Sequence, residues 1–251
     1  MCSSATRLLW IALFWMGWTL QGEQQDHNQN AWFNYFGDHP LSDGPWGIHF
    51  DAQFRRSDLG AEPMQVLVQP GLNYQCASGW QLAAGYGFME TSAYGHHPVP
   101  VALPEHRFWQ QASRTSKLGS LSLQHRFRVE QRFLGQNNQG IQPAKVDSYR
   151  YENRLSYRLA TTLPLKALGC DKLYFKISDE VFVNLGEQVL GNHFDQNRAY
   201  VALGRPIGKH GKLELGFMEQ TLQMRGGNVF QNNHTLMISF FSDWPFGSRQ
   251  K

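Results

Sequence analysis

From residue 46 onward, the chain is built of runs in which apolar and polar residues alternate, with Gly-, Pro- and Asn-rich segments between the runs. The first run places apolar side chains at Trp46, Ile48, Phe50, Ala52 and Phe54, with polar residues or glycine between them. Alternation with a period of two is typical of a β-strand whose two faces meet different surroundings. No amphipathic helix interrupts the series. Ten such strands are predicted, at about 46–55, 66–75, 80–88, 103–113, 119–133, 148–160, 171–184, 195–206, 211–225 and 231–242.

The lengths of these runs favour a membrane-spanning sheet over a soluble sandwich. A soluble strand usually has ~5–6 residues, whereas a tilted strand needs ~9–11 to cross a bilayer. A closed barrel satisfies every backbone polar group in lipid, which an open sheet cannot. Five aromatic residues would lie near the periplasmic rim, where amphipathic rings favour the membrane interface. They are Trp46, Tyr74, Trp80, Tyr157 and Trp244.

Connections between the runs alternate in length, as in outer-membrane barrels with short periplasmic turns and longer outer loops. Long or polar connections lie near 57–63, 91–102, 134–147, 185–194 and 226–230, and short ones near 76–78, 114–118 and 207–210. The connection near 161–170 is an exception of intermediate length. The predicted fold is therefore all-β, a single antiparallel up-and-down transmembrane β-barrel of about ten strands. About twelve strands is the alternative, if the aromatic segment at 32–36 belongs to an extra strand pair.

The N-terminus has the features of an export signal. Arg7 precedes an apolar run from Leu8 to Leu20, which is too short for a spanning helix of ~20 residues and is typical of a signal peptide. We expect a signal at 1–22, an N-terminal lead-in segment at 23–45 and the barrel at 46–251. Cys76 and Cys170 remain in the mature chain, and their spacing matches no metal motif.

Composition narrows the function. Charged residues make up 17% of the chain, below the roughly 25% of soluble proteins. The net charge is +3 without any Lys/Arg block, which disfavours nucleic acid as a partner. Three histidines, His96, His97 and His106, surround the second long loop, but no ligand spacing supports a metal site there. We expect no cofactor.

The polar faces carry many Arg and Glu side chains, which in a barrel would fill the lumen. If the strands on either side of 134–147 form a hairpin, one simple register places Glu130 opposite Arg150 and Arg128 opposite Glu152. That register places Arg126 opposite Arg154, so this pair needs a further carboxylate. Glu180 on the next strand is the predicted one. Opposite charges across two strands stabilise a sheet by roughly 0.2–1 kcal/mol per pair. The predicted lumenal charge network comprises Arg107, Arg126, Arg128, Glu130, Arg132, Arg150, Glu152, Arg154, Glu180, Arg198 and Glu214.

Several of these strand segments resemble the domain-of-unknown-function family 2490 (DUF2490) of predicted outer-membrane proteins. The resemblance implies a barrel in the bacterial outer membrane, and it brings no established activity and no catalytic residues. The matching segments are EHRFWQQ (105–111), RFRVEQR (126–132), YENR (151–154), DEVFVN (179–184), QNR (196–198) and LELGFM (213–218), with WFNYFG (32–37) before them.

Three functions remain open. The first is a barrel without enzymatic activity, largely closed by lumenal Arg/Glu ion pairs, with a structural or surface-interaction role. The second is a small passive channel with weak anion selectivity. The third is a lipid-modifying enzyme, since His125 and Asn153 share the apolar phase of adjacent strands, although no Ser lies near them in that phase. The expected partners are outer-membrane lipid and, during biogenesis, the barrel-assembly machinery, with a monomeric chain.

Overall fold

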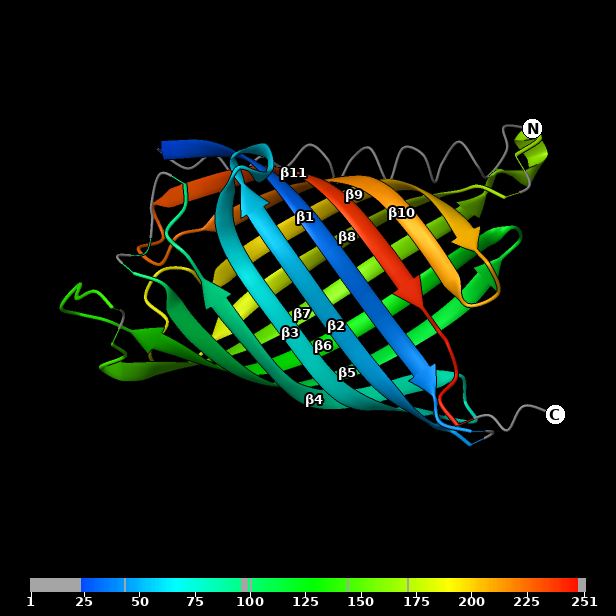
Figure 1. The fold of residues 1–251 in the computed structure, drawn as a ribbon, viewed down its shortest axis with the longest axis horizontal. Coiled ribbons are helices and arrows are strands. Elements are labelled where there is room, and N and C mark those ends of the chain that lie inside the picture. Colours follow the sequence, from blue (N-terminus) through cyan, green and yellow to red (C-terminus); the bar gives the residue numbers. More distant parts are fainter. Residues whose placement is uncertain are drawn as a thin grey trace.

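Eleven strands close into one barrel in the computed structural model, which describes residues 24–42, 44–95, 99, 101–143, 145–170 and 172–247 (Figure 1). The expected signal at 1–22 lies outside these residues. The strands are β1 (Gln24–Pro40), β2 (Trp46–Ser57), β3 (Glu62–Gln75), β4 (Trp80–Thr91), β5 (Leu103–Leu118), β6 (Leu121–Gln136), β7 (Ser148–Pro164), β8 (Tyr174–Leu185), β9 (Phe194–Ile207), β10 (Gly211–Gln223) and β11 (Val229–Ser242).

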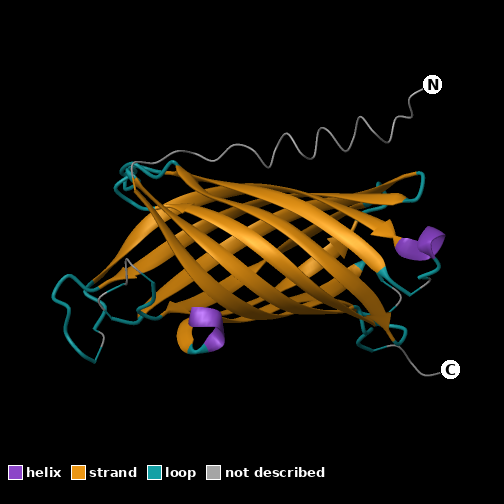
Figure 2. Ribbon diagram, turned by 90° about the horizontal axis from the view of Figure 1, so that it is seen from above, coloured by secondary structure: helices purple, strands orange, loops and turns teal. Residues whose placement is uncertain are grey.

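The all-β barrel predicted from the sequence is confirmed, and the ten predicted strands correspond to β2–β11. Helical structure among the described residues is limited to two short 3-10 segments, η1 (Asp58–Gly60) and η2 (Leu165–Leu168), seen at the ends of the barrel in Figure 2. None of the described helices has the length and apolar character needed to cross a membrane.

The strand count and the closure differ from the prediction. Residues 23–45, expected as a lead-in, supply β1, so the barrel wall begins at Gln24 and not at residue 46. β1 pairs antiparallel with β2 and parallel with β11. An odd number of strands connected up and down requires one parallel pair at the closing seam. The alternation was obscured in β1 because Trp32 and Asn34 face inward while Ala31 and Phe33 face outward, which makes three apolar residues consecutive.

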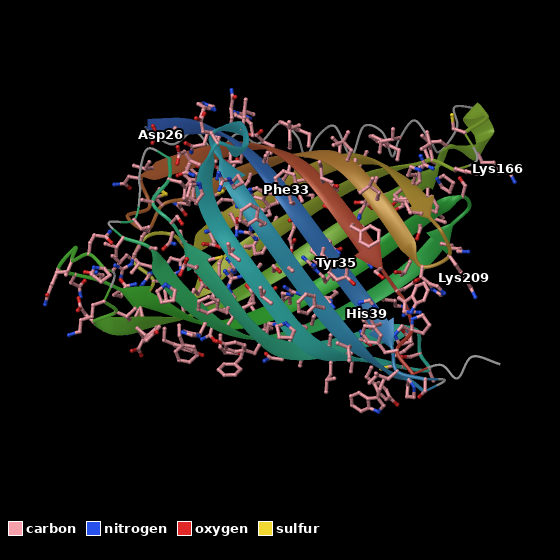
Figure 3. All side chains as sticks on the ribbon, in the orientation of Figure 1. Asp26, Phe33, Tyr35, His39, Lys166 and Lys209 are labelled. Carbon is pink, nitrogen blue, oxygen red and sulfur yellow. The ribbon has the colours of Figure 1, made fainter. Side chains whose placement is uncertain are left out.

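The predicted alternation of connection lengths holds only in part. The end that carries the connections 58–61, 92–102, 137–147, 186–193 and 224–228 is called the loop end. One connection at the other end, 165–173, is longer than 58–61 or 224–228. The opposite end is called the turn end, and it carries Lys166 and Lys209, whereas Asp26 lies at the loop end (Figure 3). Of the aromatic residues expected at one rim, Trp46, Tyr74, Trp80 and Trp244 lie at or next to the turn end, while Tyr157 is in the middle of β7.

Burial in this barrel is the inverse of that in a soluble protein. Apolar side chains cover the outer wall, where Phe108 is 52% exposed and Leu215 is 61% exposed. Polar and charged side chains fill the interior, where Glu130 is 3% exposed and Asn233 is completely buried. Phe33 and Tyr35 show the same arrangement on β1, where they lie on the outer wall between inward-facing neighbours (Figure 3). Exposed apolar walls of this extent are rare in soluble monomers.

Candidate functional site

The candidate site is the lumenal charge network, and all eleven residues predicted for it face the interior of the barrel. They come from six consecutive strands: Arg107 from β5; Arg126, Arg128, Glu130 and Arg132 from β6; Arg150, Glu152 and Arg154 from β7; Glu180 from β8; Arg198 from β9; and Glu214 from β10.

Glu130 joins three arginines, one from its own strand β6 and one each from β5 and β7. Its carboxylate accepts a hydrogen bond of 2.6 Å from Arg154 Nε, and a second oxygen–nitrogen distance to Arg154 Nη2 is 2.5 Å. Arg107 Nη1 and Arg128 Nη1 approach Glu130 Oε1 at 3.6 and 3.8 Å. The other end of the Arg154 guanidinium donates to Asp195 at 3.0 Å. Each buried charge in this group therefore has at least one counter-charge, which burial in low dielectric requires.

Glu105 forms a second node on the adjacent strand. Arg132 donates to both carboxylate oxygens, at 2.6 Å from Nε and 3.0 Å from Nη2, in the paired geometry that gives Arg–carboxylate contacts their strength. Arg107 Nε donates to the same carboxylate at 2.6 Å. Arg150 hydrogen bonds to Glu152, which lies 4.0 Å from Arg132 Nη1. These contacts connect β5, β6 and β7 into one ion-paired layer in the half of the lumen nearer the loop end.

Two further pairs lie closer to the turn end. Arg126 Nη2 donates to both oxygens of Glu180 at 2.6 and 2.7 Å. Glu180 is the partner that was predicted for Arg126 from the sequence. Glu214 is separate from the arginines, because its partners are Lys176 Nζ at 3.0 Å and the hydroxyls of Tyr174 and Tyr200 at 3.0 and 3.2 Å. Ten of the eleven predicted residues therefore form three groups along the lumen and not one continuous cluster, and Arg198, which donates to Gln196, belongs to none of them.

The register predicted for the β6–β7 hairpin is wrong by four residues. Glu130 lies opposite Arg154, Arg132 opposite Glu152, and Arg126 opposite Arg158. β6 continues to Gln136, three residues into the segment predicted as a loop, and this moves the centre of the hairpin. An even shift keeps every side chain on its own face of the sheet. The inward set was therefore identified although its pairings were not.

Trp109 is a fully buried part of the site that pattern analysis did not single out. Its ring packs against Gly71 and Gly85, where a Cβ atom would meet Trp109 Cζ2 at 2.6 and 2.7 Å. His49 packs edge-on to this ring, and the guanidinium carbon of Arg128 lies 4.9 Å from its centre. These two strand glycines therefore leave room for close lumenal packing.

Other interior charges were also missed by the sequence analysis. Glu105, Arg158, Lys176 and Asp195 all face the lumen. Glu105, Arg158 and Lys176 lie on the polar faces of β5, β7 and β8, so the alternation of polar and apolar residues is sufficient to identify them. Asp195 lies beside the irregularity between Phe182 and Val183 in the β8–β9 pairing, which breaks the simple alternation there.

Polar residues on the outer wall are hydrogen-bonded to one another, and His125 and Asn153 have separate partners. His125 Nδ1 lies 2.8 Å from the Tyr157 hydroxyl, and Asn153 accepts from the Tyr151 hydroxyl at 2.8 Å. The two are not register partners, since His125 lies opposite Leu159. His106 lies on the outer wall at 2.5 Å from the Tyr86 hydroxyl, while His96 and His97 are outside the described residues. Among the described residues, no group of three metal-ligating side chains converges.

The lumen still contains a cavity of about 820 Å³. Its lining extends from Lys172 and Lys212 near the turn end to Thr91 and Tyr94 at the loop end. At the loop end, Val101 of the β4–β5 connection is buried. The β8–β9 and β10–β11 connections pack on each other there through Gly191 N–H, which donates to the Arg225 carbonyl at 3.1 Å. The interior is thus a polar space interrupted by ion pairs.

Comparison with known proteins agrees with a family without assigned function. An uncharacterized protein of Methylorubrum extorquens is 24% identical over 179 residues, covering 70% of this chain and 72% of that protein. Among solved structures, outer-membrane expressed OmpT of Vibrio cholerae aligns with a TM-score of 0.38 at 10% identity, over 78% of this chain and 58% of that one. The Pseudomonas aeruginosa outer-membrane protein OpdK aligns with a TM-score of 0.28 at 12% identity, over 71% of this chain and 52% of that one.

The chain thus spans little more than half the length of these two solved structures. The sequence match to a family is far more extensive. The model of the family described as "Protein of unknown function (DUF2490)" matches residues 29–231, which include parts or all of every strand of the barrel. The resemblance drawn from the strand motifs is confirmed, and the chain belongs to the DUF2490 family.

Proposed function

We propose that this protein is a bacterial outer-membrane barrel without enzymatic activity, whose lumen is closed to free diffusion by buried Arg/Glu ion pairs. The observation that carries this proposal is the inverted burial: an exposed apolar outer wall around a buried, ion-paired interior. Such a wall is stable in the hydrocarbon of a membrane. The closed order of the strands also leaves no backbone edge unpaired, as a location in lipid requires. The role that follows is structural or one of surface interaction.

Its partners in this proposal are outer-membrane lipid and the assembly machinery that inserts barrels, and the chain acts as a monomer. Long connections at the loop end face outward from the cell, as in bacterial barrels. This orientation makes the β4–β5, β6–β7 and β8–β9 connections the surface available to external partners.

Fractionation with heat-modifiable migration tests the proposal. The protein should be found in the outer-membrane fraction and should migrate differently on a denaturing gel before and after boiling, because a closed barrel resists detergent at room temperature. Recovery of the chain in the periplasmic wash, with identical migration of the boiled and unboiled samples, would contradict the proposal.

A small anion-selective channel is the second candidate, and the cavity of about 820 Å³ favours it. Arginines outnumber carboxylates in its lining, so an open path would admit anions more readily than cations. Conductance of the purified protein in a planar bilayer separates the two functions, because a closed lumen gives no steady current.

A further inference from the structure

Two lumenal arginines stand apart from the ion-pair network. Within the described chain, neither Arg55 nor Arg198 has a carboxylate oxygen within 4.0 Å. Arg55 is 6% exposed and donates only to neutral amides, at 3.0 Å to Gln53 Oε1 and 2.5 Å to Gln65 Oε1. Arg198 donates to Gln196 Oε1 at 3.1 Å. The hydrogen-bond partners of both guanidinium groups are therefore neutral side-chain amides.

The same aromatic ring brings these two arginines together. The guanidinium carbon of Arg55 lies 4.0 Å from the centre of the Trp32 ring, and that of Arg198 lies 5.4 Å from it. Arg55 is the direct neighbour of Trp32 in the β1–β2 register, whereas Arg198 reaches it from β9. The two cations are close enough to repel one another. A buried pair of like charges is unfavourable without a counter-charge.

Unpartnered polar groups lie on the same face of β1. The indole Nε1 of Trp32, which is 2% exposed, has no hydrogen-bond partner. Neither the amide nitrogen nor the amide oxygen of the completely buried Asn30 has one. Donors that are buried and unpaired are expensive, and a bound ligand is one of the ways in which proteins satisfy them.

Tyr94 covers this group from the β4–β5 connection. It packs against the cluster that contains Trp32, and it lines the lumenal cavity together with Arg55 and Arg198. Burial raises the pKa of Tyr94, and its side chain also hydrogen-bonds with Gln231. Asp51, Glu180 and Asp195 act on the two arginines only from beyond salt-bridge distance.

We infer that Arg55, Arg198 and Trp32 form a lumenal binding site for one oxyanion, the carboxylate or phosphate group of a small solute. A planar guanidinium pairs well with two oxygens of such a group. The Trp32 indole supplies a further donor. The site is independent of whether the lumen conducts, since it can be reached from the cavity on either account of the function.

Isothermal titration of the purified, detergent-folded barrel tests this site with two probes, sodium benzoate and inorganic phosphate. Saturable binding of at least one probe is expected, and the better probe identifies the preferred oxyanion. Arg55→Gln and Arg198→Gln should each weaken that binding about ten-fold or more, because each removes charge-assisted hydrogen bonds. Arg55→Lys keeps the charge but loses the fork, so it should bind with intermediate affinity.

Arg114→Gln is the matched control. Arg114 also lies over a Trp ring, at 5.9 Å from Trp80, but on the outer wall, so its loss should leave probe binding unchanged. Unaltered heat-modifiable migration establishes that each variant is folded. Absence of saturable binding of both probes to the unmodified protein overturns the proposal, as does binding that Arg114→Gln weakens as much as Arg55→Gln does.

Discussion

Glu130 is the lumenal carboxylate with the most arginine neighbours among the described residues, three within 4.0 Å. It is 3% exposed and has Arg154 at 2.5 Å, with Arg107 and Arg128 within 3.8 Å. Its neutralisation would leave these arginines with excess positive charge in a low-dielectric interior. Removing one partner of a buried ion pair strongly destabilises the folded state, because the other charge remains buried without a counter-charge.

Glu130→Gln should therefore lower the free energy of unfolding by about 3–5 kcal/mol. The measurement is the urea midpoint of the refolded barrel, followed by the loss of heat-modifiable migration. Glu219→Gln is the control, because Glu219 pairs with His234 at 2.6 Å on the outer wall, where both side chains are more than one-third exposed. Equal midpoints for the two variants would show that the interior pairs do not stabilise the barrel.

Gly85 has a different role, because the packing around it leaves no room for a side chain. A Cβ at this position would meet the Pro70 carbonyl oxygen at 2.2 Å and Trp109 at 2.7 Å. Gly85→Leu should therefore prevent close packing of the β3–β4 wall on Trp109 and reduce the yield of folded barrel on refolding. Gly226→Ala, where nothing lies within 4 Å, should refold like the unmodified chain. A normal yield for Gly85→Leu would contradict the packing seen around Trp109.

At the scale of the strand, β1 decides how the barrel closes. Its inward Asn34 donates to Ser239 of β11 at 3.0 Å, and the parallel seam continues from Gln24 to Gly37. Because β1 runs in the same direction as β11, it begins at the loop end. In a ten-strand barrel with a periplasmic lead-in, the first residues of β1 would instead lie on the periplasmic side of the membrane.

Cysteine labelling in intact cells distinguishes these arrangements. Gln29→Cys, in a Cys76→Ser/Cys170→Ser background, should react with a membrane-impermeant maleimide, because residue 29 is exposed near the loop end of β1. Asn138→Cys in the β6–β7 connection is the positive control. The native Cys170, exposed next to η2 at the turn end, should react only after permeabilisation. Protection of Gln29→Cys alongside reaction of Asn138→Cys would rule out the parallel seam.

Sequence periodicity predicted β2–β11 and the inward phase of the network because faces follow from a period of two, whatever the register. It failed for β1, whose inward Trp32 and Phe36 interrupt the alternation. It failed for the β6–β7 pairings because the hairpin centre depends on where a loop begins, and polar residues such as Gln136 fit both strand and loop. The Trp32–Arg198 contact joins β1 to β9 across the lumen, and no local sequence pattern predicts a contact between residues so far apart in the chain.

For the whole molecule, the question is whether the ion pairs close the lumen to ions. The charged layer of β5–β9 lies within a cavity of about 820 Å³, so side chains and not the backbone would limit flow. Replacing one glutamate and one arginine of the layer with small residues removes one charge of each sign, so the net charge of the lumen is unchanged. Glu130→Ser/Arg154→Ser therefore widens the lumen at the layer without changing its net charge, although Arg128 and Asp195 each lose a partner.

In a planar bilayer, the unmodified protein should give no steady current, and Glu130→Ser/Arg154→Ser should give a measurable one that rises with salt concentration. Glu219→Ser/His234→Ser makes a comparable replacement of a charge pair on the outer wall, and it should be as silent as the unmodified protein. A steady current through the unmodified barrel equal to that of the lumenal double variant would mean that the ion-paired layer does not obstruct the path. The passive channel would then be the better account of the fold, because the interior charges would select ions and not exclude them.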